Sequence, residues 1–253
     1  AVGSNIRIDA RGRSVLRVLP RLHEDVNEEW LADKSRHAID GLGRQRLDRP
    51  YVRENGKLRP ASWDEAFKAV TDKFNATAAD RIAAIAGDQC DAESMFALKS
   101  LMEAKGSKNM DCRQDGAALG EGGNRSGWLF NTTIAGLEEA DVVVLVGSNP
   151  RWEAPLINAR IRKRFLTGEL HVFGVGAPHD LSYQTDWVGA GPQTLSDILD
   201  GRTAAADALR NAKKPVIIVG QGALAREDGA AVLNMAGQLA AKHGASQADF
   251  SGC

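Results

Sequence analysis

Short apolar runs alternate with helical segments from Ser62 to the end of the chain, and this alternation limits the fold more than any other feature. The clearest run, Asp141–Val146, consists of β-branched and apolar residues, which is typical of a strand covered on both faces. Similar runs occupy 81–86, 170–175 and 215–219. Strands that alternate with helices of this length predict an α/β fold with Rossmann-like parallel sheets, right-handed crossovers and flanking helices.

Helix boundary signals support this pattern. Ser62-Trp63-Asp64-Glu65 has the form of a capping box, in which the serine hydroxyl and the glutamate satisfy each other's backbone donors. Asp91 is the expected cap of the next helix, and Gly106 is placed to end it. Further helices are expected at 155–166, 193–200, 203–212 and 227–243, and the stretch 178–192 is expected to be a loop.

Residues 1–58 have a different pattern and are expected to form a hairpin-rich segment. Asn5–Ile8 and Val15–Leu19 flank a glycine-containing turn, and Asn55-Gly56 is a strong signal for a second hairpin. A short helix is expected at about 25–37. The arginine-rich stretch 44–59 lacks interleaved aromatic residues and lies near acidic residues, so a solvated or partner-facing surface is favoured over nucleic-acid binding.

Charge and cysteine usage exclude several classes of protein. The 253 residues have a formal net charge of -1, which gives no general attraction to nucleic acid or to an anionic membrane. No apolar run approaches the roughly 20 residues of a membrane span. Three scattered cysteines, Cys90, Cys112 and Cys253, argue for a reducing compartment and against a disulfide framework. The two ends of the sequence suggest an internal piece of a longer polypeptide.

One candidate binding site follows the buried run 141–146. Gly147, Ser148, Asn149 and Pro150 lead from a strand into a helix, at the sheet edge where α/β proteins bind ligands. A glycine here permits the close approach of a phosphate or nucleotide, although an ordinary turn is the favoured interpretation. Gly220 to Ala225 fits the dinucleotide pattern G-x-G-x-x-A, which is weak support when it stands alone.

Metal and catalytic patterns give no complete site, so no catalytic residue and no metal ligand is expected. The glycine-rich stretch Gly116 to Gly127 lacks the Lys-Ser/Thr ending of a phosphate-binding loop. The histidines have no partners at metal-binding spacing, and three cysteines cannot supply the four thiolates of an iron–sulfur cluster. Cys90 and Cys112 are expected to be small buried residues.

Several long runs resemble one protein family. They are Pro20 to Trp30, Asp33 to Arg36, Asp40 to Leu42, Arg44 to Leu47, Asn131 to Gly136, Glu139 to Asp141, Gly147 to Arg151, Glu153 to Pro155 and Asn158 to Lys163. Together they resemble the molybdopterin-oxidoreductase-like region of the large peripheral subunit of NADH:quinone oxidoreductase (respiratory complex I), which is the family of the mitochondrial 75 kDa subunit and its bacterial counterpart. The frame from Arg49 to Ala66 is similar to the wider molybdopterin oxidoreductases, such as formate dehydrogenase.

This resemblance implies a function for the parent protein and a modest role for this part of it. The parent would carry electrons from NADH to quinone through 2Fe-2S and 4Fe-4S clusters held in a preceding part. This chain would be a structural scaffold without cofactors. The loop Gly147–Pro150 would be a vestigial nucleotide loop, because the molybdenum ligand of active members would fall near Ala117, where no suitable side chain stands. The alternative is a fragment of an active molybdopterin enzyme.

The resemblance also implies partners, a location and a division into domains. Other peripheral-arm subunits of complex I are the expected partners, with no nucleic acid and no membrane insertion. The expected location is the cytoplasmic side of the bacterial inner membrane or the matrix side of the mitochondrial one. Three parts are expected: 1–58 as the remnant of a cluster-type domain, 59–112 plus 213–253 as one α/β domain, and 113–212 as an inserted α/β domain. A nucleotide-binding enzyme remains a third interpretation, which explains only the last strand and helix.

Overall fold

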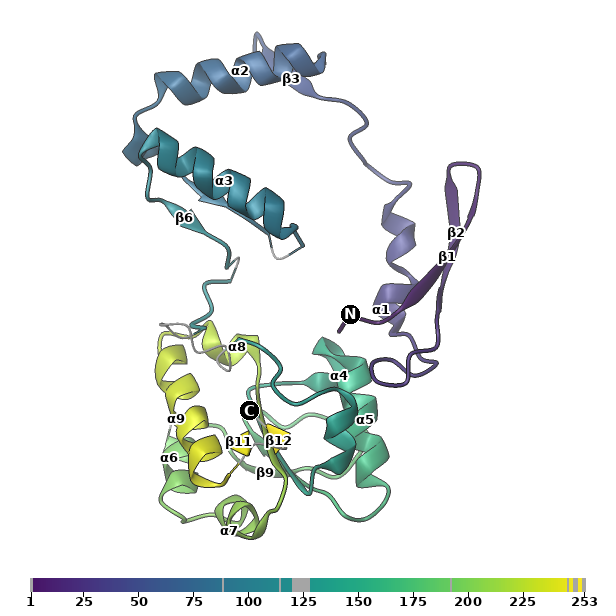
Figure 1. Cartoon of the computed structure of the whole chain (residues 1–253), viewed down its shortest axis with the longest axis vertical. Coiled ribbons are helices and arrows are strands. Elements are labelled where there is room, and N and C mark those ends of the chain that lie inside the picture. Colours follow the sequence, from purple (N-terminus) through teal and green to yellow (C-terminus); the bar gives the residue numbers. More distant parts are fainter. Residues whose placement is uncertain are drawn as a thin grey trace. The chain divides into compact units, whose positions relative to one another are not determined.

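A computed structural model describes residues 2–87, 89–113, 115–119, 128–191, 193–244, 246–247 and 250–251. The chain divides into two compact units. Unit 1 contains Ala1–Asp40 and Ala117–Cys253, and unit 2 contains Gly41–Gly116. Each unit is described by itself below (Figure 1).

A four-stranded parallel sheet forms the centre of unit 1. Its strands lie in the order β10 (Pro215–Val219), β7 (Val142–Val146), β8 (His171–Val175) and β9 (Asp186–Gly189). The chain runs outward from β7 through β8 to β9 and then returns to the other side of β7 as β10. The carboxyl ends of β7 and β10 are therefore neighbours at the point where the direction of winding reverses, which is the usual ligand position in open α/β sheets.

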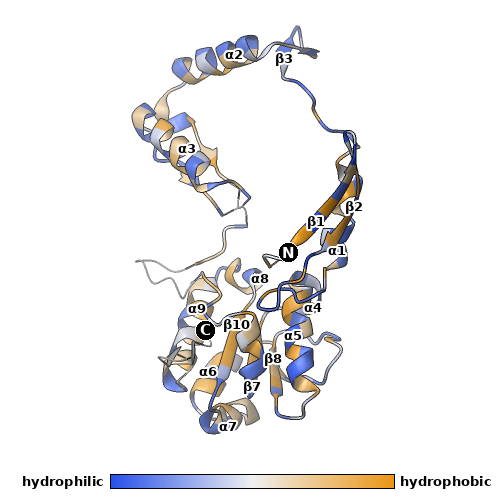
Figure 2. Cartoon of the chain, turned by 45° about the vertical axis from the view of Figure 1, so that its right-hand side comes forward, coloured by the Kyte–Doolittle hydropathy of each residue, from blue (hydrophilic) through white to orange (hydrophobic). Residues whose placement is uncertain are grey.

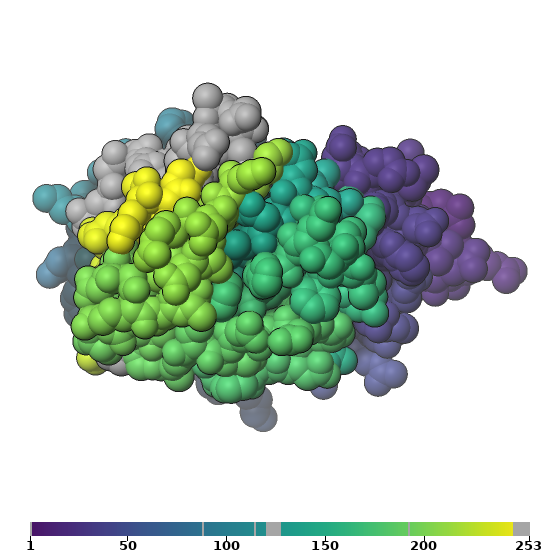
Figure 3. All heavy atoms as spheres, turned by 90° about the horizontal axis from the view of Figure 1, so that it is seen from below, coloured from purple at the N-terminus to yellow at the C-terminus, as the bar shows by residue number. Residues whose placement is uncertain are grey.

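Helices cover both faces of this sheet. In chain order they are η4 (Ala135–Glu139), α4 (Pro150–Glu153), α5 (Pro155–Phe165), α6 (Gln193–Leu199), α7 (Ala204–Asn211), α8 (Gln221–Leu224) and α9 (Gly229–Lys242). One buried cluster joins the sheet to α6, α7 and α9, and a second joins it to η4 and α5. All five residues of β7 are buried, as a strand covered on both faces requires. The neighbouring strand β10 is hydrophobic along its length (Figure 2). Figure 3 views this packed unit from the side of α7.

The first 40 residues form a small irregular layer of unit 1. They contain the hairpin β1 (Ile6–Arg11) and β2 (Ser14–Pro20), a short helix α1 (Asp33–Arg36) and all but the last residue of the turn η1 (Ala38–Gly41). Asn27, which is 2% exposed, holds the connecting loop together: its amide oxygen accepts from Asn5 N–H, and its amide nitrogen donates to the carbonyls of Arg21 and Trp30. The helix expected at 25–37 is thus shortened to four residues, because this loop satisfies its backbone groups through Asn27.

Arg160 fastens this layer to the sheet. The side chain comes from α5, is 5% exposed, and donates to Glu138 and to the backbone carbonyl of Glu24. Lys163 completes the cluster by pairing with Glu28 at 2.7 Å and with Glu138 at 3.0 Å. Two cations and two carboxylates balance one another here, so a buried guanidinium is accommodated without an unpaired charge.

Unit 2 is built from short elements. They are the hairpin β3 (Tyr51–Glu54) and β4 (Lys57–Pro60), the helix α2 (Trp63–Ala76), the turn η2 (Ala79–Arg81), and β5 (Ala84–Ile85), α3 (Ala92–Lys105) and β6 (Met110–Asp111). Ser62 and Glu65 form the expected capping box, and Gly106 ends α3 at φ +82°. Strands β5 and β6 pair in parallel as a two-stranded sheet. Among the described residues of this unit, only Met102 and Ser107 are buried.

The expected fold class is confirmed, with a hairpin-bearing segment before parallel sheets and flanking helices. The strands group differently from the expected division, because 215–219 pairs with β7 and not with the strands of 59–112. The physical reason is that β10 is apolar on both faces, and pairing with β7 buries Val216 and Ile217. The expected loop 178–192 also contains a strand, β9, which the sequence pattern did not reveal.

Candidate functional site

The candidate site lies at the carboxyl ends of β7 and β10. Gly147 leaves β7 and Gly220 leaves β10, and both loops stay tied to the sheet, since Gly147 N–H donates to Val175 at 2.8 Å and Gly220 N–H donates to Val146 at 2.9 Å. A methyl group added to Gly220 would overlap the Gly147 carbonyl and lie 2.9 Å from Ser148 Cα. The two glycine loops therefore touch each other directly.

Gly147 allows another group to approach its backbone closely, and in this structure that group belongs to the same chain. Its φ of +55° lies in the left-handed region that favours glycine. A Cβ at this position would lie 2.7 Å from Cβ of Ala223, which belongs to α8. The space above the glycine, where a phosphate could approach in a nucleotide site, is thus filled by the alanine side chain.

The remaining residues of the loop are satisfied by Glu153. This carboxylate accepts from the Ser148 hydroxyl at 3.2 Å and from Asn149 N–H at 2.8 Å, while Pro150 is buried at the start of α4. The negative charge stands at the amino end of a helix, where exposed N–H groups favour an anion. Sequence reasoning missed Glu153, which lies four residues after the N-cap Asn149 and so falls outside the three-residue spacing of a capping box. The Asn149 Oδ1 atom is buried, with no hydrogen-bond partner in the described part of the chain.

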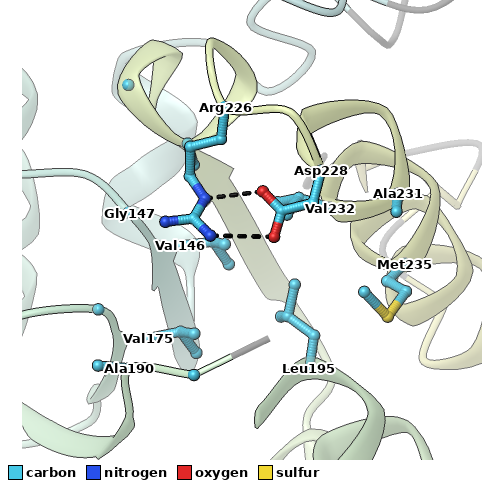
Figure 4. A pocket seen from close by; sticks show the side chains of 14 residues that line it. Val146, Gly147, Val175, Ala190, Leu195, Arg226, Asp228, Ala231, Val232 and Met235 are labelled. Carbon is cyan, nitrogen blue, oxygen red and sulfur yellow. Dashed lines mark hydrogen bonds and ion pairs between the residues drawn. The ribbon is translucent and has the colours of Figure 1, made fainter. Parts of the chain in front are cut away.

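A cavity of about 340 Å³ opens beside these loops. Its wall is formed mainly by apolar side chains and glycines from the ends of β7 and β8 and from α6, α8 and α9 (Figure 4). Arg226 and Asp228 form an ion pair at this cavity, with Nε–Oδ1 at 2.7 Å and Nη2–Oδ2 at 3.1 Å. Their hydrogen bond raises the pKa of Arg226 and lowers that of Asp228. The cavity thus offers apolar contact and one neutralised ion pair.

The dinucleotide pattern at Gly220–Ala225 has another geometry. A dinucleotide site needs a glycine turn that opens directly into a long helix. Here the residues form the four-residue helix α8, and the long helix α9 begins only at Gly229. Gly220 is required for packing on Gly147, whereas a Cβ at Gly222 would meet nothing within 4 Å.

No complete set of metal ligands occurs in the described part of either unit. Ala117, where the resemblance places the molybdenum ligand of active members, is 1% exposed and has only a methyl group. Residues 120–127 of the glycine-rich stretch lie outside the described residues. Within the described ranges, no group of three or more His, Cys, Asp or Glu side chains could hold a metal ion. The described helices include none long and apolar enough to cross a membrane.

The two described cysteines differ from expectation. Cys90 and Cys112 were expected to be buried, and this prediction is wrong, because both are exposed. They lie in the loops that follow β5 and β6, where no layer of unit 2 covers them.

Comparison with known proteins decides the family. The family model for molybdopterin oxidoreductase matches residues 46–252. The chain belongs to the molybdopterin oxidoreductase family. It is also 44% identical over 252 residues to the G subunit of NADH-quinone oxidoreductase from Rickettsia felis and to that from Rickettsia bellii, in each case over 100% of this chain and 37% of the relative. These relatives confirm the resemblance, and the chain spans about a third of their length.

A second family model bears on the first 40 residues. It describes the NADH-ubiquinone oxidoreductase NDSU1/NuoG-like 4Fe-4S domain and matches residues 1–40. Iron–sulfur clusters therefore belong to this kind of protein, which qualifies the expectation of a part without cofactors. Clusters are held by sets of cysteine thiolates. Residues 1–40 contain no cysteine, so these residues themselves do not fit a cluster.

Proposed function

We propose that this chain is part of the iron–sulfur subunit of NADH–quinone oxidoreductase and serves there as a scaffold. In that protein, electrons would pass from NADH to quinone through clusters of the 2Fe-2S and 4Fe-4S types held outside these 253 residues. The names of the relatives and the 4Fe-4S domain match support this assignment.

One observation carries the scaffold role. At the sheet edge where the family could hold a nucleotide, two positions open to a phosphate are taken by this chain's own groups: Ala223 packs on Gly147, and Glu153 takes the anion position at the start of α4. A phosphate would have to displace a methyl group and then lie against a carboxylate of the same sign. We therefore assign Gly147, Ser148, Asn149 and Pro150 to a vestigial loop without a ligand.

The proposal includes partners and a location. Other peripheral-arm subunits of the complex would contact this chain, on the cytoplasmic side of the bacterial inner membrane or the matrix side of the mitochondrial one. The net charge of -1 favours protein partners over nucleic acid. The exposed basic stretch around Arg46 and the acidic loop around Glu29 are the surfaces proposed to face a partner or the cluster-bearing domain.

An active molybdopterin enzyme is the second candidate, supported by the family match over 46–252. The residues present do not fit its cofactor. Ala117 offers no ligand atom, and Ala223 and Glu153 occupy the positions at Gly147 and at the start of α4 that a phosphate would need.

Metal and nucleotide content test the proposal. We expect the full chain, produced in a host that supplies molybdopterin and iron–sulfur assembly, to contain far less than one iron or molybdenum per chain by elemental analysis. Guanine nucleotides released by acid should likewise be absent. The variant Gly222→Ala, purified and analysed in the same way, is the control for the procedure. Stoichiometric metal or nucleotide would overturn the scaffold role.

Assembly tests the partner surfaces. In the full-length parent, the charge reversals Arg46→Glu and Glu29→Lys are expected to reduce incorporation into the complex, measured by native gel. Lys68→Glu, on an exposed face of α2 with an ordinary ion pair to Asp72, is the matched control. Normal assembly of both charge-reversed variants would refute the surfaces proposed here.

A further inference from the structure

A second sheet edge, in unit 2, has a chemistry that the proposed function does not use. Strands β5 and β6 are parallel, with Ala84 opposite Met110 and Ile85 opposite Asp111. The pairing continues past the strands, since Ala86 N–H donates to the Asp111 carbonyl at 3.0 Å. Both strands therefore end at the same edge, and their loops begin about 5 Å apart, the spacing of paired strands.

Each of these two loops carries an exposed cysteine. Cys112 directly follows Asp111 at the end of β6. Cys90 lies beyond β5, and its N–H donates to the Gly87 carbonyl at 3.1 Å, which folds the loop back toward the strand end. It immediately precedes Asp91, the cap of α3. A disulfide needs Cα atoms roughly 4.4–6.8 Å apart, a range that exposed loops leaving paired strands can reach.

The loop after β6 also holds an ion pair beside Cys112. Asp111 accepts from Arg113 at 3.0 Å and 3.1 Å, and its Oδ1 also accepts from the N–H of Cys112 at 2.7 Å. The hydrogen bonds from Arg113 lower the pKa of Asp111 to about 2. The pKa of Arg113 is raised, chiefly by its hydrogen bond to Asp111. Asp111 thus fixes the backbone of Cys112 and Arg113 at the end of β6, since it accepts from the N–H of each.

We propose that Cys90 and Cys112 form a peroxide-responsive dithiol pair at the carboxyl edge of β5 and β6. One thiolate attacks an oxygen of hydrogen peroxide, which breaks the O–O bond, forms a sulfenic acid and, after protonation, releases water. The second thiolate attacks this sulfur, forms the S–S bond and releases the hydroxyl group as a second water. The two thiols lose two electrons in total, and peroxide accepts them.

The consequence is a covalent link between the start of α3 and the end of β6. Helix α3 joins these two points along the chain, so the disulfide would close the β5–α3–β6 unit on itself. This goes beyond the proposed scaffold role, which assigns no chemistry to unit 2. It also stands independently of that role, because the thiols can respond whether or not the parent carries clusters.

The test uses the full chain with Cys253→Ser, which leaves only the two proposed thiols. With one equivalent of hydrogen peroxide, both thiols should disappear together, and the chain should lose the mass of two hydrogen atoms without forming dimers. A non-reduced peptide map should show Cys90 joined to Cys112. In Cys112→Ser, the link is lost, and a 1,3-dione such as dimedone should trap a sulfenic acid at Cys90.

The same reaction in urea is the control for proximity. The native chain should form the link much faster than the unfolded chain, because the sheet edge brings the thiols together only in the fold. Equal rates in the two conditions, separate oxidation of each thiol to sulfinic acid, or links only between different chains would each overturn the proposal.

Discussion

Units 1 and 2 both contain parallel strands joined through a helix, yet they differ greatly in how many of their residues are buried. In unit 1, β7 has five residues that are all buried between two layers of helices. In unit 2, β5 and β6 have two residues each, and Ile85 is 68% exposed. A parallel sheet needs cover on both faces, and only unit 1 provides it.

The difference extends to the sheet edges. At the edge of β7 and β10, glycines let the chain fold onto itself, and Glu153 satisfies the loop donors. At the edge of β5 and β6, two cysteines remain exposed. A sheet edge packed with groups of the chain itself has a structural role. An exposed sheet edge stays accessible to reagents and partners. Four measurements test this contrast.

Hydrogen exchange should show the largest difference. Amides of Val143, Val144 and Leu145 should exchange only through global unfolding, while those of Ala86 and Met110 should exchange through local opening. A gap of roughly 4 kcal/mol, or about a thousandfold in rate, is expected because little in unit 2 is buried. Native-state exchange followed by NMR or mass spectrometry measures it. Equal protection in the two sheets would contradict the comparison.

Arginine replacement compares a buried ion cluster with an exposed one. Arg160→Met leaves Glu138 without its buried partner and frees the carbonyl of Glu24, so the free energy of unfolding should fall by about 3 kcal/mol. The matched change is Arg59→Met in unit 2, where Arg59 pairs with Glu54 at 2.6 Å and Glu65 at 3.1 Å on the surface. That loss should stay below about 1 kcal/mol.

Urea unfolding of the two arginine variants, read by fluorescence and by circular dichroism, gives both values. A smaller loss for Arg160→Met than for Arg59→Met would show that the first 40 residues are not fastened by this cluster.

Glycine replacement tests the closed edge itself. In Gly220→Ala the added methyl group meets backbone atoms of Gly147 and Ser148, which cannot move as a flexible side chain can, so a loss of about 2 kcal/mol is expected. Gly222→Ala, two residues away in α8, meets nothing within 4 Å and should be neutral or slightly stabilising. Thermal unfolding of both variants measures the difference. A neutral Gly220→Ala would mean that the two loops do not touch.

The sequence predicted best where local signals coincide with burial. The run 141–146 predicted β7, and Ser62 with Glu65 predicted the start of α2. It predicted least well where a contact between residues far apart in the sequence determines the local structure or the strand pairing. The buried side chain of Asn27 replaces the expected helix at 25–37, and the return of β10 to β7 changes the expected grouping of strands. No local pattern encodes either contact.

The candidate site shows the same limit. The sequence identified Gly147 as a place of close approach but could not say what approaches it. The answer, Ala223, lies 76 positions later and comes from a pattern that resembled a dinucleotide site. The exposure of Cys90 and Cys112 was not predicted, for a related reason. A small apolar side chain is buried only where other elements pack over it, and the two-residue strands β5 and β6 offer little surface for such packing.

Acid titration of Glu138 is the smallest expected effect and sharpens the arginine comparison. Burial alone would raise the pKa of this carboxyl group, but hydrogen bonds from Arg160 and Lys163 outweigh it, and the net pKa is lowered. A lowered folded-state pKa gives stability that is present above the unfolded value, about 4.3, and is lost as the pH falls through the folded value.

The stability advantage of the parent chain over Glu138→Gln should therefore be constant from pH 7 to about 5 and shrink below it. The advantage over Asp72→Asn, whose carboxylate pairs with Lys68 on the surface of unit 2, should be small throughout. Urea midpoints measured across this pH range give both curves. If the Glu138→Gln difference stays flat to pH 3, the carboxylate is not held by the cations of α5, and the buried cluster would be no different from a surface pair.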